Sequence, residues 1–139
     1  MGIKLVLLSE KGIVFEGECE RFLLSSYKGD MEVSPGYTPI VEMLDKEGIL
    51  KVVLPNKTMY FAIFDATLSV TKEGAFIVSS NTEEASSIDL ARASQAKDRA
   101  MKRLTSKQEG IDLLRAKAAL NRALIRIKVK RLYNGEKLY

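Results

Sequence analysis

Short apolar segments rich in β-branched and aromatic residues follow one another through the first part of the chain. They occupy residues 3–8, 13–18, 20–26, 31–34, 49–54, 58–64, 67–70 and 75–80. Clusters of Gly, Pro, Asn, Asp and Lys separate them, as in strands joined by turns. Because no long helical pattern interrupts the series, it predicts an antiparallel sandwich or barrel rather than a parallel sheet. Pro39 is expected at a strand start or edge, where its missing N–H costs little.

The hydrophobic period changes after Asn81, where the chain becomes rich in helix formers. One helix is predicted to extend to Leu104, with Ser86 or Ser87 as its N-cap and Asp89 in its first turn. A second helix is predicted over residues 111–132, after a break at Gly110.

The short connection between the two helices predicts an antiparallel pair. The expected fold class is therefore β plus α, with two parts. An N-terminal antiparallel β-sandwich occupies residues 1–85, and a C-terminal antiparallel two-helix hairpin occupies residues 86–139.

The hairpin contains an internal repeat. The 16-residue stretches that begin at Ile88 and at Ile111 agree at nine positions, including an Asp at the second position. Both also carry arginines at the fifth, twelfth and sixteenth positions, which are Arg92, Arg99 and Arg103 in one copy and Arg115, Arg122 and Arg126 in the other. At about 100° per residue each set forms one stripe bordered by alanines. In the second helix the stripe lies opposite Leu113, Leu120, Leu124 and Ile127. Such a stripe is either a solvated face or a binding face for anions, and the repetition favours binding.

Charge is distributed unequally between the two parts. The formal net charge is −5 over residues 1–85 and +9 over residues 86–139. This asymmetry points to an acidic partner, which can be a phosphate, an acidic protein surface or anionic lipid. No window approaches the roughly 18 apolar residues of a membrane span.

The composition excludes several kinds of chemistry. The chain has no His and a single Cys19, which removes the commonest general base, an internal disulfide and a cysteine-based zinc site. We expect Glu16, Glu18 and Glu20 to form a solvated face, Cys19 to be a core residue, and Met31 and Met43 to be packing residues. No serine has a visible base partner, so we expect no enzyme and no metal site.

Several segments together resemble a known family. The stretch IVFEGECERFLLSSYKGDMEVSPGYTPIV, the helix start IDLARASQAKDRAMKRL and the helix DLLRAKAALNRALIRIKV resemble, in this order, the epsilon subunit of the F-type ATP synthase. The likeness covers nearly the whole chain. One departure is the loop Ser34-Pro35-Gly36-Tyr37, where the family usually has Leu-Pro-Gly-His. Another is Asp65-Ala66-Thr67, where the family commonly has paired glycines.

The resemblance implies a non-catalytic rotor subunit of the central stalk that couples rotation of the c-subunit ring to ATP synthesis. Its partners would be the gamma subunit, the c-subunit ring and the catalytic alpha and beta subunits. The loop expected near the ring contains Glu32, Val33, Ser34, Pro35 and Tyr37. The hairpin would regulate ATP hydrolysis. The complex would hold the subunit peripherally on the cytoplasmic face of the bacterial membrane.

The resemblance also implies a regulatory ATP site, while no cofactor is required. Ile88, Asp89 and Ala93 match the family's Ile-Asp-x-x-Arg-Ala motif. The residues expected to face the triphosphate are Arg92, Arg99, Arg122 and Arg126, and Glu83 is a further candidate. No glycine-rich phosphate loop of the Walker type is present.

The alternative function is nucleic-acid binding by the basic hairpin. Because no aromatic residue occurs from Ser86 to Leu132, the hairpin lacks base-stacking groups. We therefore expect no nucleic-acid partner.

Overall fold

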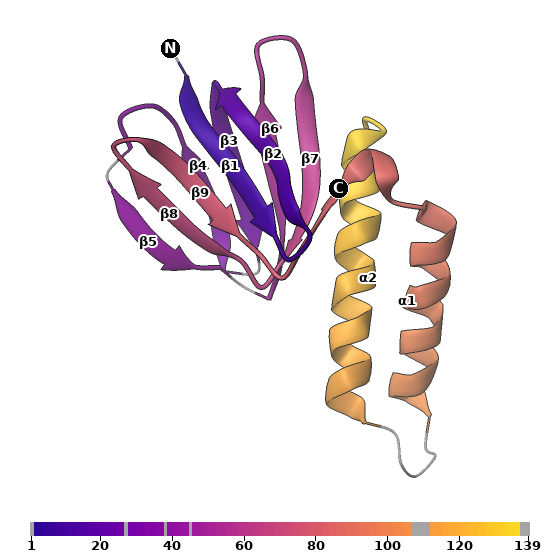
Figure 1. Cartoon of the computed structure of the whole chain (residues 1–139). Helices are drawn as coiled ribbons and strands as arrows, with labels where there is room; N and C mark the ends of the chain where they lie inside the picture. The colour runs from indigo at the N-terminus through magenta and orange to yellow at the C-terminus, as the bar shows by residue number, and fades with distance from the viewer. Residues whose placement is uncertain (1, 27, 38, 45, 107–111, 137–139) are drawn as a thin grey trace. The chain divides into compact units, whose positions relative to one another are not determined.

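The computed structural model describes residues 2–26, 28–37, 39–44, 46–106 and 112–136. The chain divides into two compact units, Met1–Glu84 and Ala85–Tyr139. The first contains the strands and the second contains the helices (Figure 1).

The first unit is a β-sandwich of two five-stranded sheets. Its strands are β1 Ile3–Ser9, β2 Gly12–Cys19, β3 Arg21–Ser26, β4 Gly29–Val33, β5 Ile40–Met43, β6 Glu47–Val53, β7 Thr58–Phe64, β8 Thr67–Thr71, β9 Gly74–Val78 and β10 Asn81–Glu84. The first sheet has the order β2-β1-β9-β8-β5 and the second the order β10-β7-β6-β3-β4. The predicted sandwich is confirmed, and Pro39 directly precedes the edge strand β5.

The sheet topology corrects the sequence prediction in two respects. Strands β5 and β10 were not predicted, because IVEM is only four residues long and NTEE contains no apolar residue. The sandwich is also not purely antiparallel, since β1 pairs in parallel with β9, with Leu5 opposite Ala75 and Leu7 opposite Ile77. The N-terminal strand enters the middle of its sheet, so its second neighbour comes from much later in the chain.

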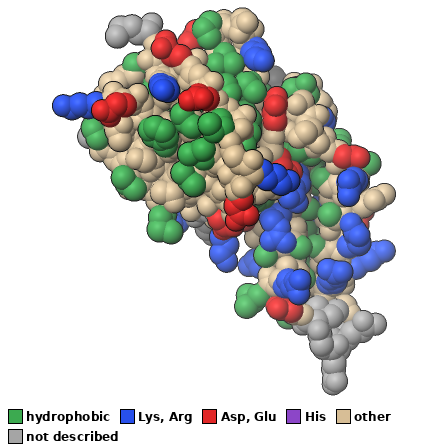
Figure 2. All heavy atoms as spheres, in the orientation of Figure 1, with side chains coloured by type: hydrophobic (Ala, Val, Ile, Leu, Met, Phe, Trp, Pro, Cys, Tyr) green, Lys and Arg blue, Asp and Glu red, His purple; other side chains and the backbone are tan. Residues whose placement is uncertain are grey.

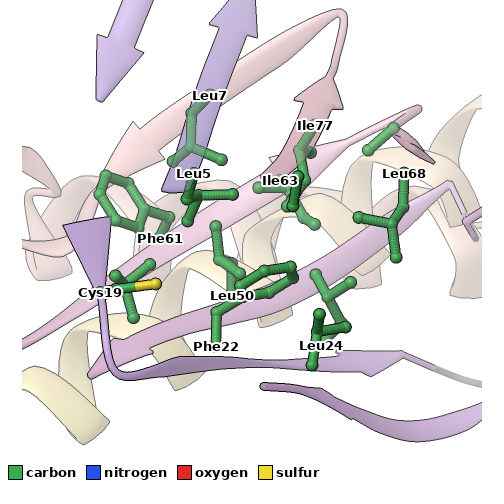
Figure 3. Close-up of a cluster of buried hydrophobic side chains, with 14 of the residues drawn as sticks. Leu5, Leu7, Cys19, Phe22, Leu24, Leu50, Phe61, Ile63, Leu68 and Ile77 are labelled. Atoms are coloured by element: carbon green, nitrogen blue, oxygen red, sulfur yellow. The ribbon is translucent and has the colours of Figure 1, made fainter. Parts of the chain in front are cut away.

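Alternate residues from both sheets form the hydrophobic core between them. Figure 3 shows Leu5, Leu7 and Ile77 of the first sheet facing Phe22, Leu50 and Phe61 of the second. Cys19 lies in this core as predicted, with 1% of its surface exposed. Met31 packs against the core. The same prediction for Met43 is wrong, because this edge-strand residue is 78% exposed.

The second unit begins with a 3-10 turn at Ala85–Ser87, followed by α1 at Leu90–Thr105 and α2 at Leu113–Tyr133. The prediction of Ser86 or Ser87 as N-cap is wrong, because both residues belong to the 3-10 turn and Asp89 caps α1. The predicted break at Gly110 and helix start at Ile111 lie outside the described residues. Neither α1 nor α2 has, within the described residues, a stretch long and apolar enough to cross a bilayer.

Candidate functional site

The internal repeat builds both helix starts in the same way. The carboxylate of Asp89 accepts a hydrogen bond from the backbone N–H of Arg92 at 3.1 Å. Asp112 accepts one from the backbone N–H of Arg115, also at 3.1 Å. Both aspartates have extended backbone angles, as N-cap residues do. The repeated Asp therefore closes the first turn of each helix.

The repeat also supplies the seam between the helices, which lie side by side and antiparallel (Figure 1). The buried residues of α1 are Ala93 and Ala100, and their repeat equivalents in α2, Ala116 and Ala123, are buried as well. A buried methyl group contributes only roughly 0.8 kcal/mol, against roughly 1.5–3 kcal/mol for a leucine side chain. The part of the seam formed by these four alanines is therefore weakly hydrophobic, and α2 also buries Ile127 and Val129 nearer its C-terminal end.

The arginine stripes run along the rim of this seam. Arg92 and Arg99 each precede a buried alanine by one position, which turns them about 100° away from the seam. Arg115 and Arg122 have the same relation to the seam alanines of α2. Arg126 is half-buried, and the other five arginines of the stripes are exposed.

Both stripes lie on one face of the hairpin. Two antiparallel helices that pack through equivalent positions are related by a two-fold axis normal to the plane containing them, and this operation leaves each face on its own side. Equivalent residues of the two copies therefore share a face. Figure 2 shows Lys and Arg side chains gathered over the hairpin.

The register of the helices follows from the buried alanines. Placing Ala93 opposite Ala123 also places Ala100 opposite Ala116, because the members of each copy are seven residues apart. The same register puts Lys130 at the level of Ser86, and the Lys130 Nζ donates a hydrogen bond to the neighbouring Ala85 carbonyl at 3.2 Å.

In this register Arg122 and Arg126 each lie within about 3 Å of Arg92 along the helix axis, at about 1.5 Å per residue. We call Arg92, Arg122 and Arg126 the first arginine cluster. Arg99 is about 10 Å further along the axis than Arg92. Three of the four residues predicted to face the triphosphate therefore lie at the same level of the hairpin, and the fourth, Arg99, is two turns away.

The remaining residues of the predicted ATP site have structural roles here. Ile88 is 6% exposed, Ala93 belongs to the seam and Asp89 is the N-cap of α1. Glu83 lies in β10 of the other unit, where it pairs with Ala62 and accepts a hydrogen bond from Asn81 at 2.7 Å. Among the described residues no carboxylate forms an ion pair with Arg92, Arg99 or Arg122.

The opposite rim of the seam carries exposed apolar side chains as well as the exposed Lys117 and Lys128. Met101 and Leu124 each follow a buried alanine by one position, so they face away from the arginines, and they are 49% and 41% exposed. Leu113, predicted on the apolar side of its helix, is also more than half exposed. Of that predicted set, Ile127 is buried.

The loop predicted to lie near the ring is a tight turn. The backbone N–H of Tyr37 donates to the Ser34 carbonyl at 3.1 Å, and Gly36 has φ +85°. Pro35 and Gly36 at the two central positions make this a type II turn. Ser34 and Pro35 are exposed, while Tyr37 packs partly against the core.

Strand β4 leads into this turn. The Glu32 carboxylate pairs with the Arg21 guanidinium at 3.0 Å on the surface. The side chain of Val33 is fully buried in the core, so a partner at this position can reach only its backbone or its neighbours.

The structure adds a surface that sequence reasoning missed. On the outer face of the first sheet, cross-strand pairing places apolar side chains from four strands in two neighbouring rows, in which Ser69 and Thr67 of β8 lie between the residues of β9 and those of β5. The apolar residues are Val6, which is 5% exposed, and Leu8, Ile13, Val41, Met43, Phe76 and Val78. Of these, Val41 is 77% and Ile13 59% exposed. Figure 2 shows hydrophobic side chains gathered on the visible face of the sandwich. We call these seven residues the outer apolar patch.

A pocket of about 140 Å³ opens between the β3–β4 hairpin and the β5–β6 connection. Leu24, Met31 and Ile63 line it together with polar residues such as Asp30. It is smaller than the roughly 300 Å³ of typical small-molecule sites. Within the described part of the chain, no group of His, Cys, Asp or Glu side chains could hold a metal ion.

Comparison with family models identifies the class of protein. Residues 2–85 match the beta-sandwich domain, and residues 86–131 the long alpha-helix domain, of the ATP synthase delta/epsilon chain. The chain therefore belongs to the delta/epsilon chain family of ATP synthases. This confirms the resemblance found in the sequence, and it gives no support to the nucleic-acid alternative.

Individual relatives agree with the family models. The chain is 36% identical to the ATP synthase epsilon chain of Anoxybacillus flavithermus over 106 residues, which are 76% of this chain and 78% of that one. It is 35% identical to the ATP synthase epsilon chain of Bacillus thuringiensis over 102 residues, covering 73% and 76% of the two chains.

Two cryo-EM structures share the fold. A chain of the Euglena gracilis mitochondrial ATP synthase, solved with OSCP, F1 and the c-ring, matches with a TM-score of 0.78 at 19% identity, over 94% of this chain and 81% of that chain. A chain of the Tetrahymena thermophila mitochondrial ATP synthase, from its central stalk and c-ring, matches with a TM-score of 0.56 at 11% identity, over 94% of each chain.

Proposed function

We propose that this protein is a non-catalytic subunit of the central stalk of a proton-translocating F-type ATP synthase. In this role it couples rotation of the c-subunit ring to ATP synthesis. The family match through both domains supports the proposal, as do relatives named ATP synthase epsilon chain. The observation that carries it is the outer apolar patch. Exposed apolar side chains gathered on one face of a sheet mark a protein contact, and a subunit held in an assembly needs one.

The gamma subunit of the stalk is the partner we assign to the outer apolar patch. The turn at Ser34–Tyr37, with the exposed Ser34 and Pro35 at its tip, is the contact assigned to the c-subunit ring. The complex holds the subunit at the cytoplasmic face of the bacterial membrane.

Co-purification with the gamma subunit tests the docking surface. Val41→Asp together with Met43→Asp places two charges on the exposed edge strand and should abolish co-purification while leaving the sandwich folded. The matched control is Thr58→Asp, an exposed residue of β7 in the other sheet, which should keep full binding. If the double variant binds gamma as tightly as the unchanged chain, gamma does not dock on the outer apolar patch.

The hairpin is the regulatory part in this proposal. Alanines form its seam at Ala93, Ala100, Ala116 and Ala123, and larger buried side chains occur in α2 only at Ile127 and Val129, so separating the helices along most of their length exposes little apolar surface. A hairpin that is stabilised by little burial of apolar surface can exchange one set of contacts for another. Such an exchange is a common form of conformational switch. One arrangement permits ATP hydrolysis, and another reaches the catalytic alpha and beta subunits and blocks it.

Regulatory ATP is assigned to the first arginine cluster, and Arg99 lies two turns further along α1. Guanidinium groups bind phosphate oxygens in a forked geometry, and each such bond contributes roughly 1.5–3 kcal/mol. The bound anion also offsets the repulsion among the arginines, so ATP favours the folded hairpin. Titration calorimetry of the full chain should show ATP binding that is lost in Arg122→Gln with Arg126→Gln. No heat at about millimolar ATP would exclude an affinity useful for regulation.

Hydrolysis by the assembled catalytic head tests regulation as a whole. Heads carrying the full chain should hydrolyse ATP more slowly at low ATP than heads carrying a chain that ends at Glu84. Equal rates would leave the sandwich as a coupling element and remove the regulatory role of the hairpin.

A further inference from the structure

Because the two helices are related by a two-fold axis, the first arginine cluster has an equivalent set of arginines elsewhere on the hairpin. Moving each of its residues by the 23-residue repeat converts Arg92 to Arg115, Arg122 to Arg99 and Arg126 to Arg103. We call Arg99, Arg103 and Arg115 the second arginine cluster. All three lie on the same face of the hairpin as the first cluster, toward the other end of the seam.

The geometry of the second cluster matches that of the first. In the register fixed by the seam alanines, Arg115 lies at the level of Met101, about 3 Å along the axis from both Arg99 and Arg103. The three guanidinium groups are exposed. Among the described residues no carboxylate forms an ion pair with any of them. Each cluster also lies beside the N-terminus of one helix, α1 for the first and α2 for the second.

The clusters are separate sites. Their centres are about nine residues, or roughly 13 Å, apart along the helix axis. A diphosphate or triphosphate group that fills one cluster does not reach the middle of the other. The structural role of the repeat requires only Asp and Ala, so helix capping and seam packing do not explain arginines at the twinned positions.

We propose that the second arginine cluster is a second anion site, which binds a ligand with two or more linked phosphate groups independently of the first cluster. Three clustered guanidinium groups match the charge of such a ligand better than that of a single carboxylate. The N-terminal end of α2 adds a favourable dipole for an anion. The folded hairpin therefore holds two polyphosphate groups on one face, one near each end of the seam.

Titration calorimetry of the full chain with inorganic triphosphate tests this site, because the probe lacks a base and sugar. The expected stoichiometry is two. Arg103→Gln with Arg115→Gln should reduce it to one or weaken one event by at least about tenfold, as expected for lost charge-assisted bonds. Gln has a helix propensity similar to that of Arg, and circular dichroism should confirm an unchanged helix content.

The matched control is Lys117→Gln with Lys128→Gln. At about 100° per residue these exposed lysines lie about 120–140° from Ala123, in the sense opposite to Arg122 and Arg126, so both are away from the arginine face. This variant removes the same charge and should keep a stoichiometry of two. If it loses an event as readily as the arginine variant does, binding is non-specific and the second site is refuted.

The results also separate this site from the ATP site. A single event that Arg122→Gln with Arg126→Gln removes, and Arg103→Gln with Arg115→Gln leaves unchanged, refutes the second site while the first stands. A single event with the reverse pattern supports the second site and refutes the first. No binding to any form refutes both.

Discussion

Asp89 accepts a hydrogen bond from the backbone N–H of Arg92 at 3.1 Å, and this bond closes the first turn of α1. Asp112 makes the equivalent bond in α2. The Ile-Asp-x-x-Arg-Ala start is therefore a cap followed by a seam residue in both copies. Neither the cap nor the seam uses the arginine side chain of this motif. The arginines are therefore the candidates for binding a ligand.

The caps give the first prediction. Asp112→Ala should lower the free energy of unfolding of the hairpin by about 1 kcal/mol, because the N-terminal amides lose their acceptor. Asp112→Asn should retain most of the stability, since Asn caps as well as Asp does. Denaturant unfolding followed by far-ultraviolet circular dichroism measures both. Asp98→Ala, an exposed change in the middle of α1, is the control, and an equal loss there would show that capping is not the cause.

The sequence predicts the elements of this fold better than their pairing. Segments such as 58–64 are rich in β-branched and aromatic residues, so they predict a strand whichever strand they pair with. In contrast, β10 has the polar sequence Asn81-Thr82-Glu83-Glu84. It forms a strand because it pairs with β7 at the edge of the sheet. The parallel pairing of β1 with β9 is likewise a property of the assembled sheet.

The candidate sites show the same limit. Helical angles place the arginines on one stripe per helix, but only the buried alanines reveal that the two stripes share a face and form two clusters. The outer apolar patch combines Ile13, Val41 and Phe76, which come from three strands. No local pattern places such residues on one face of a sheet, because their common position depends on sheet order and register.

The alanine seam gives the second prediction. Ala100→Leu should destabilise the hairpin by about 1–3 kcal/mol, because the larger side chain has no space between closely packed helices. Ala91→Leu on the exposed side of the same helix should change stability by less than about 0.5 kcal/mol. Thermal unfolding of the helical signal compares the two. Similar melting temperatures would mean that α1 and α2 do not pack through Ala100.

The turn at Ser34–Tyr37 gives the third prediction. Gly36 has φ +85°, and a Cβ there would meet nothing within 4 Å, so the cost of Gly36→Ala is conformational rather than steric. We expect a loss of about 1–2 kcal/mol in stability, which is the usual penalty for this backbone region. Gly17→Ala, where φ is not in the left-handed region and the nearest atom is 3.5 Å away, should be nearly neutral. Urea unfolding measures the stability of the two variants. A Gly36→Ala variant with unchanged stability would contradict the type II turn.

Cys19 gives the last prediction, which concerns pH. Burial, with a smaller contribution from the charge of Glu18, raises the pKa of the Cys19 thiol from 9.0 to about 11. Between these values the unfolded chain loses the thiol proton while the folded chain keeps it. The contribution of Cys19 to stability is therefore complete below about pH 9 and declines as the pH rises toward 11.

Two units of pKa correspond to roughly 2–3 kcal/mol. Because other groups also titrate in this range, the useful quantity is the difference in unfolding free energy between the unchanged chain and Cys19→Ala. Alanine has no proton to lose, so this difference should shrink by roughly that amount when urea unfolding is repeated at increasing pH. Curves that stay parallel up to pH 11 would show that the thiol ionises equally easily in both states, and that the core between the two sheets does not exclude water at Cys19.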